Sequence, residues 1–139
     1  MKLIYILILF LVLGFESPKK AKITIIITNI EEVKGQIKIA LYNKEADFLH
    51  QEQKYKGAEV KIDSTRVKYT FTDIPLGEYA ITLFHDENSN GKMDRNFIGL
   101  PSEGTAFSNN IRPHFGPPKY EDAVFDLESD KVVYLRLVY

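Results

Sequence analysis

Cysteine is absent from this chain of 139 residues. Without a thiol there can be no disulfide, thiolate metal ligand, cysteine nucleophile or lipid attached through an N-terminal cysteine. An excess of one charge is also missing, because 18 basic and 19 acidic residues leave a net charge of −1. We therefore expect neither a basic surface for nucleic acid nor an acidic tail. Stability has to come from packing, with a bound metal ion as a supplement.

The chain also lacks an apolar run long enough to cross a membrane as a helix. The run from Leu3 to Leu13 follows Lys2, and it falls short of the roughly 20 residues that a bilayer requires. We interpret residues 1–16 as a secretory signal peptide and residues 17–139 as a single domain, with an uncleaved anchor as the alternative. The protein is then exported, periplasmic or extracellular, with no transmembrane segment after signal removal.

Alternation of apolar and polar residues predicts β-strands along most of the chain. In the first such segment, Ile23, Ile25 and Ile27 are spaced at period two, and β-branched residues at this period indicate a strand. One or two helical turns are expected around residues 45–49. Seven short strands with one buried face each predict an all-β fold, a seven-stranded immunoglobulin-like or transthyretin-like β-sandwich. The predicted strands are 21–30, 35–43, 58–62, 67–72, 79–83, 121–127 and 131–138.

A segment of about 35 residues between the fifth and sixth predicted strands shows no periodicity. Connections in compact domains are usually about 4–6 residues long, so a loop of this length is either functional or disordered. Its apolar content is too high for simple disorder. We therefore predict one long ordered loop, folded over one end of the sandwich. The apolar residues are Phe97, Ile98, Leu100, Phe107, Ile111 and Phe115.

The long loop opens with DENSNGKMD, which has oxygen-bearing side chains at every second residue. Asp86, Asn88 and Asn90 are followed by Gly91, and Asp94 comes four residues after Asn90. This spacing matches the first nine positions of a calcium loop of the EF-hand type. Hard divalent cations take six to eight oxygen ligands, and a tight turn permitted by glycine can direct alternate side chains at one ion. The sequence therefore predicts a calcium site.

Two positions of this loop carry residues without a side-chain oxygen. The seventh ligand is a backbone carbonyl, so Lys92 can occupy that position despite its charge. The twelfth position is Phe97 instead of glutamate, and Glu103 is the nearest later carboxylate. The alternatives to a calcium site are a site for another divalent ion and an ordinary Asn-Gly turn without metal. The predicted calcium ligands are Asp86, Asn88, Asn90, the Lys92 carbonyl, Asp94 and Glu103.

Other polar residues are better explained by structural roles than by chemistry. Tyr79 at a strand corner is expected to donate its hydroxyl to a carbonyl a few residues upstream. His85 is expected to be hydrogen-bonded at the sandwich rim, with a transition-metal site shared with Asp86 and His114 as the alternative. Ser108, Asn109 and Asn110 form a compact polar cluster, in which Asn109 and Asn110 are expected to satisfy loop backbone groups. No nucleophile with a nearby base and no G-x-S-x-G motif is visible, so we do not predict an enzyme.

Two stretches resemble known families. The segment FTDIPLGEYAITL, Phe71 to Leu83, resembles the corner and strand of transthyretin-like and carboxypeptidase-regulatory-like sandwiches. The longer run from Phe84 to Asn110 resembles a family of uncharacterised secreted bacterial proteins, domain of unknown function 2141. This resemblance extends over most of the chain after the signal and implies an exported β-sandwich without an assigned activity. Asn88 and Asn90 replace the aspartates of tighter calcium loops, which predicts modest affinity.

These observations favour an exported, non-enzymatic module with a calcium-binding loop and a structural or binding role. The alternative is a carbohydrate- or peptide-binding protein that uses the long loop as a cleft. The partner would be an unidentified protein or carbohydrate. Rings lining a concave surface would favour the cleft, whereas rings buried against the sandwich would favour the module. The rings that distinguish the two are Phe97, Phe107, Phe115 and Tyr120.

Overall fold

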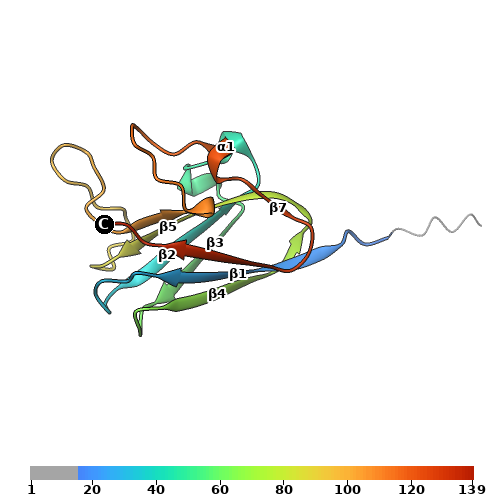
Figure 1. The fold of residues 1–139 in the computed structure, drawn as a ribbon, viewed down its shortest axis with the longest axis horizontal. Helices are drawn as coiled ribbons and strands as arrows, with labels where there is room; N and C mark the ends of the chain where they lie inside the picture. The colour runs from blue at the N-terminus through green and yellow to red at the C-terminus, as the bar shows by residue number, and fades with distance from the viewer. Residues whose placement is uncertain (1–15) are drawn as a thin grey trace, which may run out of the picture.

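The structure, a computed structural model, describes residues 16–139, so most of the predicted signal peptide lies outside the described residues. The described chain is mostly β and forms two sheets packed face to face as a β-sandwich (Figure 1). Short helical segments occur at Glu45–Asp47, Gln51–Gln53, Ser108–Asn110 and, as α1, at Tyr120–Ala123. The strands are β1 Lys20–Thr28, β2 Gln36–Tyr42, β3 Lys56–Lys61, β4 Val67–Pro75, β5 Gly77–Asp86, β6 Thr105–Phe107, β7 Phe125–Leu127 and β8 Lys131–Arg136.

The two sheets differ in size and in strand direction. The smaller sheet has the order β4-β1-β8, in which β1 is antiparallel to β4 and parallel to β8. The larger sheet has the order β3-β2-β5-β6, with antiparallel pairs throughout, and β7 pairs with one end of β5. Parallel pairing of β1 with β8 joins the two ends of the domain, because β8 is the last strand of the chain.

The main core lies between the sheets and follows the period-two pattern of the sequence. Ile23, Ile25 and Ile27 of β1 are completely buried and pack in the same cluster as Ile81 and Leu83 of β5. Burying an isoleucine or leucine side chain stabilises a fold by about 1.5–3 kcal/mol. The alternation that predicted these strands is therefore also the main source of their packing energy.

The outer face of the larger sheet carries a second, smaller core that the sequence pattern did not predict. Ala40 and Tyr42 of β2 and Ala80 of β5 are buried there against Phe48 and Ala123. Segments 43–55 and 108–124 fold back over this face, as the helical turns near α1 show in Figure 1. β2 and β5 are thus buried on both faces, and the expectation of one buried face per strand is wrong for this pair.

The structure corrects the predicted strands at two places. Eight strands occur between residues 16 and 139 instead of seven, because Thr105–Phe107 pairs with β5 inside the predicted long loop. Three residues are too few to display a periodicity. In addition, Tyr120–Ala123 is a helical turn, and the strand expected to begin at residue 121 begins at Phe125. Within the described residues, no helix is both long enough and apolar enough to span a bilayer.

The corner between β4 and β5 is held by Tyr79, as the sequence predicted. The Tyr79 hydroxyl donates a hydrogen bond to the Pro75 carbonyl at 2.7 Å. The side chain is buried, with 4% of its surface exposed, and burial raises the pKa of its hydroxyl. The single bond therefore ties the end of one strand to the start of the next within the core.

We expect Tyr79→Phe to lower the free energy of unfolding by about 0.5–1.5 kcal/mol, the usual net value of one hydrogen bond. Tyr42 offers a matched control, because its buried hydroxyl has no hydrogen-bond partner among the described residues. Tyr42→Phe removes an unsatisfied polar atom and should leave stability unchanged or slightly higher. Urea denaturation of both variants is the measurement. Equal midpoints for Tyr79→Phe and the unmodified protein would contradict the corner role.

Candidate metal centre

The predicted calcium loop begins where β5 ends, and its first residue is fixed by the sheet. Asp86 is the last residue of β5, lies opposite Gln36 of β2 in the strand register and is completely buried. The Gln36 side-chain amide donates to Asp86 Oδ2 at 3.1 Å. The carboxylate therefore belongs to the rigid end of the larger sheet, while the rest of the loop leaves it.

The backbone of the loop curls around the Asp86 carboxylate. Asp86 Oδ1 accepts from the backbone N–H of Asn90 at 3.1 Å, and Oδ2 accepts from that of Gly91 at 2.9 Å. Asn88 Oδ1 also accepts from Asn90 N at 3.1 Å, and Asn90 Oδ1 accepts from Lys92 N at 2.9 Å. Asn88 and Asn90 thus bond to the backbone two residues later, and Asp86 to the backbone four and five residues later, which folds positions one, three and five into a single tight turn.

The ninth position, Asp94, is drawn into the same turn. Asn88 Nδ2 donates to Asp94 Oδ2 at 2.6 Å, and Asn90 Nδ2 donates to Asp94 Oδ1 at 2.9 Å. The amide nitrogens of both asparagines therefore point at this carboxylate, while their oxygens accept from backbone. A cation collecting the oxygens of these three side chains would have to replace the amide bonds to Asp94. That exchange costs about 0.5–1.5 kcal/mol per hydrogen bond.

Glu103 lies at the loop although it is distant along the sequence. Its side chain is buried, and its two carboxylate oxygens accept from the backbone N–H groups of Glu87 and Asp94, each at 3.0 Å. The carboxylate thus bridges the start of the loop and its ninth position. Phe97, at the twelfth position of the calcium pattern, is completely exposed instead. The structure therefore brings Glu103, and not the twelfth residue, beside the other predicted ligands.

Two buried carboxylates at this site lack a cationic partner. Among residues 16–139, no Lys, Arg or His nitrogen lies within 4.0 Å of a carboxylate oxygen of Asp86 or Glu103. Removing an ionised carboxylate from water costs several kcal/mol unless it is paired, and the backbone and Gln36 donors offset only part of this. The site therefore has unbalanced negative charge where the backbone is already turned around it.

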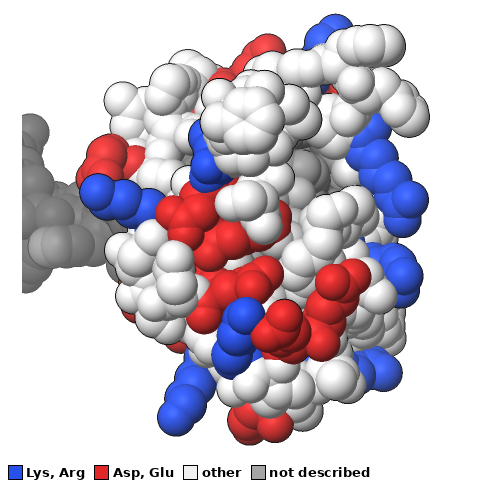
Figure 2. Space-filling model, turned by 90° about the vertical axis from the view of Figure 1, so that its left-hand side faces the viewer, with Lys and Arg blue, Asp and Glu red and all other residues white. Residues whose placement is uncertain are grey.

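Further acidic side chains gather on the same end of the molecule, as Figure 2 shows. Lys34, on the turn after β1, bonds to Glu32 at 2.7 Å and to Glu87 at 3.1 Å. These contacts raise the pKa of Lys34, and its bond to Glu32 lowers the pKa of that carboxyl. Both groups are exposed to solvent, so the pairs add little stability. Lys34 contacts the outer acids and does not contact Asp86 or Glu103.

The donor set of the site suits an oxygen-seeking ion. In the described part of the chain, no three Asp, Glu, His or Cys side chains converge closely enough to hold a metal. An ion at the loop would therefore need amide and backbone oxygens beside the carboxylates. Calcium accepts such mixed oxygen ligands, whereas zinc and copper prefer imidazole or thiolate. The residues present fit calcium by chemical type, but the asparagine amides would have to turn and the predicted carboxylates would have to come closer together.

His85 has a structural role, as predicted. It is completely buried, with Nδ1 at 2.8 Å from the Tyr139 hydroxyl and Nε2 at 2.8 Å from the Lys34 carbonyl. Both ring nitrogens are thus engaged, and burial raises the pKa of Tyr139. His114 lies in an exposed segment after Asn110. The two histidines therefore do not form a metal site with Asp86 in this structure.

Asn109 and Asn110 satisfy backbone groups, as predicted, and Ser108 does so too. Ser108 Oγ accepts from Ile81 N at 2.9 Å and donates to the Ala123 carbonyl. Asn109 Nδ2 donates to the carbonyl of Val124 at 2.9 Å. Asn110 Nδ2 donates to the Tyr134 carbonyl at 2.8 Å. These bonds attach the segment after β6 to both sheets and leave the cluster no free nucleophile.

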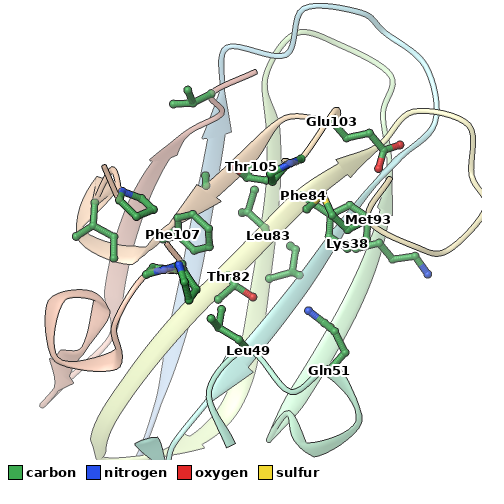
Figure 3. Close-up of a pocket in the computed structure, with 18 of the residues that line it drawn as sticks. Lys38, Leu49, Gln51, Thr82, Leu83, Phe84, Met93, Glu103, Thr105 and Phe107 are labelled. Carbon is green, nitrogen blue, oxygen red and sulfur yellow. The ribbon is translucent and has the colours of Figure 1, made fainter. Parts of the chain in front are cut away.

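A groove over the outer face of the larger sheet was missed by sequence reasoning. It has a volume of about 1620 Å³, and Thr82 and Phe84 of β5 with Phe107 of β6 form part of its lining (Figure 3). Met93 and Leu49 border it from two loops. The alternation of β5 places these side chains outward, but only the folded loops on either side create a hollow. A period-two pattern carries no signal for such a feature.

The four rings expected to distinguish the cleft from the module neither line one concave surface nor pack together against the sandwich. Phe107 lines the groove, whereas Phe97 and Phe115 do not and are 100% and 98% exposed. Tyr120 packs edge-on against Phe48, with ring centroids 5.5 Å apart. The expectation that the apolar residues of the loop fold over the sandwich is therefore wrong for both loop tips. Neither the cleft nor the module explains why Phe97 and Phe115 are exposed to solvent.

Fold and site together define a two-sheet β-sandwich whose longest loop turns around buried, unpaired carboxylates at one end. The chain belongs to the family described as an uncharacterized protein conserved in bacteria, DUF2141, whose sequence profile matches residues 25–134. The match includes the whole Asp86–Asn110 stretch, and the family resemblance seen there is confirmed. No curated protein and no solved structure matches the chain.

Proposed function

We propose that the protein is an exported, non-enzymatic module, immunoglobulin-like or transthyretin-like, that binds one calcium ion at Asp86–Asp94. One observation carries the proposal: Asp86, buried and without a cationic partner, accepts N–H groups from the fifth and sixth residues of a loop with calcium-loop spacing. The backbone is therefore turned as a calcium loop requires. The Tyr79 corner supports the sandwich type, because such corners tie strands in immunoglobulin-like domains.

The proposed ligands are Asp86, Asn88, Asn90, the Lys92 carbonyl, Asp94 and Glu103. The ion would supply the positive charge that Asp86 and Glu103 lack, and it would join the end of β5 to residue 103. Its role is to hold the loop, as metal binding couples to folding in other proteins. Three carboxylates, two of which already accept backbone bonds, point to modest affinity. We expect a dissociation constant of about 10⁻⁵–10⁻³ M, between sensor loops and extracellular modules.

Calorimetric titration of the chelator-treated protein tests the site. We expect one calcium ion to bind, and calcium at about 100 times its dissociation constant to stabilise the fold by about 2.7 kcal/mol. Magnesium should do much less, because it demands a tighter octahedral shell and keeps its waters. No heat and no shift in melting temperature at 10 mM calcium, a concentration about tenfold above the weakest expected constant, would leave Asp86–Asp94 as an ordinary turn.

Export is tested by the N-terminus of the protein recovered from cells. We expect the intact mass to correspond to a chain that starts close to residue 15–18, since the apolar run of residues 3–13 has the length of a signal peptide core. The same sample should remain in the soluble fraction at high ionic strength. A mass that retains residues 1–13, in protein recovered with the membranes, would show that the segment is an anchor.

A second candidate function is binding of a carbohydrate or peptide in the groove. The volume of about 1620 Å³ and the lining by Phe84, Phe107 and Thr82 support this candidate. The lining of the groove also carries charged side chains, Lys38, Lys54 and Arg136 among them, so a ligand would need polar or charged groups beside an apolar part. Calcium binding would serve this function indirectly, because Glu103 and Met93 of the same loop also border the groove.

A further inference from the structure

The loop that follows the candidate metal centre ends in a hydrogen-bonded apolar tip at residues 95–101. Asn96 Oδ1 accepts from the backbone N–H groups of Ile98 at 3.1 Å and Leu100 at 3.0 Å, and Arg95 Nη1 donates to the Gly99 carbonyl at 3.0 Å. An ordered backbone thus holds Phe97, Ile98 and Leu100 in solvent, exposed by 100%, 65% and 56%. Large apolar side chains grouped on an ordered surface indicate an interaction site.

A second apolar tip projects beside the first one. Segment 111–119 carries Phe115, which is 98% exposed. Both tips border the groove and rise on the same side of the larger sheet, as the two long loops at the top of Figure 1 show. Phe97 and Phe115 do not line the groove. Both rings are therefore directed into solvent and are available to a binding partner.

Inside the two tip segments the charged side chains are all basic, whereas Asp94 and Glu103 lie at the base of the 95–101 tip. Segments 95–101 and 111–119 contain no Asp or Glu, and they carry Arg95, Arg112 and Lys119. Lys119 is paired with Glu121, at 3.6 Å, whereas Arg95 and Arg112 make no ion pair within residues 16–139. Apolar tips with basic residues beside them are complementary to a surface that is apolar inside and anionic outside.

We propose that the two tips dock the protein onto an anionic lipid surface. Phe97, Ile98 and Phe115 enter the boundary between headgroups and acyl chains, and Arg95 and Arg112 contact lipid phosphates. A fluid bilayer accepts two separate convex tips without shape complementarity. A protein partner would need two pockets matched to the two tips. The docking rests on the exposed tips, and only its dependence on calcium rests on the proposed metal site.

Tryptophan fluorescence can test the docking at single positions, because the chain has no tryptophan. Phe97→Trp and Phe115→Trp each place one probe at a tip. Val33→Trp, on the turn between β1 and β2 and 52% exposed, is the matched control. With anionic vesicles, we expect a blue shift and quenching by brominated acyl chains for both tip probes. The Val33 probe should show neither the blue shift nor the quenching, even if the N-terminal segment itself binds the vesicles.

The strength of docking is measured without tryptophan probes, by comparing the partitioning of the original protein with that of single variants. Phe97→Ala should weaken partitioning into anionic vesicles about tenfold or more, since a buried phenylalanine is lost. Arg112→Gln should weaken it about fivefold, as expected for one charge near the surface. Tip probes that do not respond to vesicles would overturn the proposal. So would a blue shift that needs no lipid and grows with protein concentration, which would identify a second copy as the partner.

The dependence on calcium separates this inference from the proposed function. If the loop binds calcium, a chelator should weaken the docking of the 95–101 tip, because the ion holds the base of that loop. Quenching of Phe97→Trp that is identical with calcium and with chelator would uphold the lipid surface and count against the metal site. If calcium binds in the titration but the tip tryptophans do not respond to vesicles, the metal site is upheld and the proposed docking onto lipid is overturned.

Discussion

Asp86→Ala should remove the calcium-dependent stability of the protein completely. The expected loss is about 2.7 kcal/mol when calcium is at about 100 times its dissociation constant, because Asp86 is the first ligand of the proposed site. A further loss of about 1–3 kcal/mol is expected even without calcium, since the substitution leaves buried N–H donors unsatisfied. These donors are the backbone of Asn90 and Gly91 and the side chain of Gln36.

Denaturation curves with calcium and with chelator separate the two losses. Asp63→Ala is the matched control, because Asp63 is exposed on the turn between β3 and β4, and it should behave like the unmodified protein in both conditions. Glu103→Gln should reduce the calcium effect if Glu103 is a ligand. A calcium shift that survives Asp86→Ala would place the ion elsewhere and refute the proposed ligand set.

Gly35→Ala should be strongly destabilising. Gly35 has a φ of 65°, and an added Cβ would lie 2.1 Å from the Asp86 carbonyl oxygen and 2.8 Å from that of Glu87. The left-handed conformation alone costs a non-glycine residue about 1–2 kcal/mol. The clash with backbone adds about 1–3 kcal/mol, since neither strand end can move without breaking the pairing of β2 with β5.

Gly99→Ala measures the conformational cost alone, so its difference from Gly35→Ala gives the cost of the clash. Gly99 also lies in the left-handed region, with a φ of 83°, but an added Cβ would meet nothing within 4 Å. Gly99→Ala should therefore cost only about 1–2 kcal/mol. Thermal or urea denaturation of both variants provides the comparison. Similar losses for the two would show that the turn before β2 relaxes and that Asp86 is not held as tightly as its contacts indicate.

The elements of this fold were predictable where a local pattern decides the structure. Period-two alternation identifies β1, β2 and β5, because a strand buries every second side chain whatever its neighbours are. The Tyr79 corner is local as well, since its hydroxyl reaches only four residues back. By contrast, β6 is too short for a pattern, and its pairing with β5 depends on a loop that returns to the sheet edge.

At the candidate site, the sequence by itself determined the spacing of oxygens from Asp86 to Asp94, because alternate residues of one tight turn bond to each other locally. It could not determine that Asp86 is completely buried against Gln36, since that follows from the register of β5 with β2. The sequence pointed to Glu103 only as the nearest later carboxylate, and the tertiary structure decided its contact with Asp94 and the exposure of Phe97. The physical reason is that a long loop closes through contacts between residues far apart in the chain, and such contacts leave no period in the sequence.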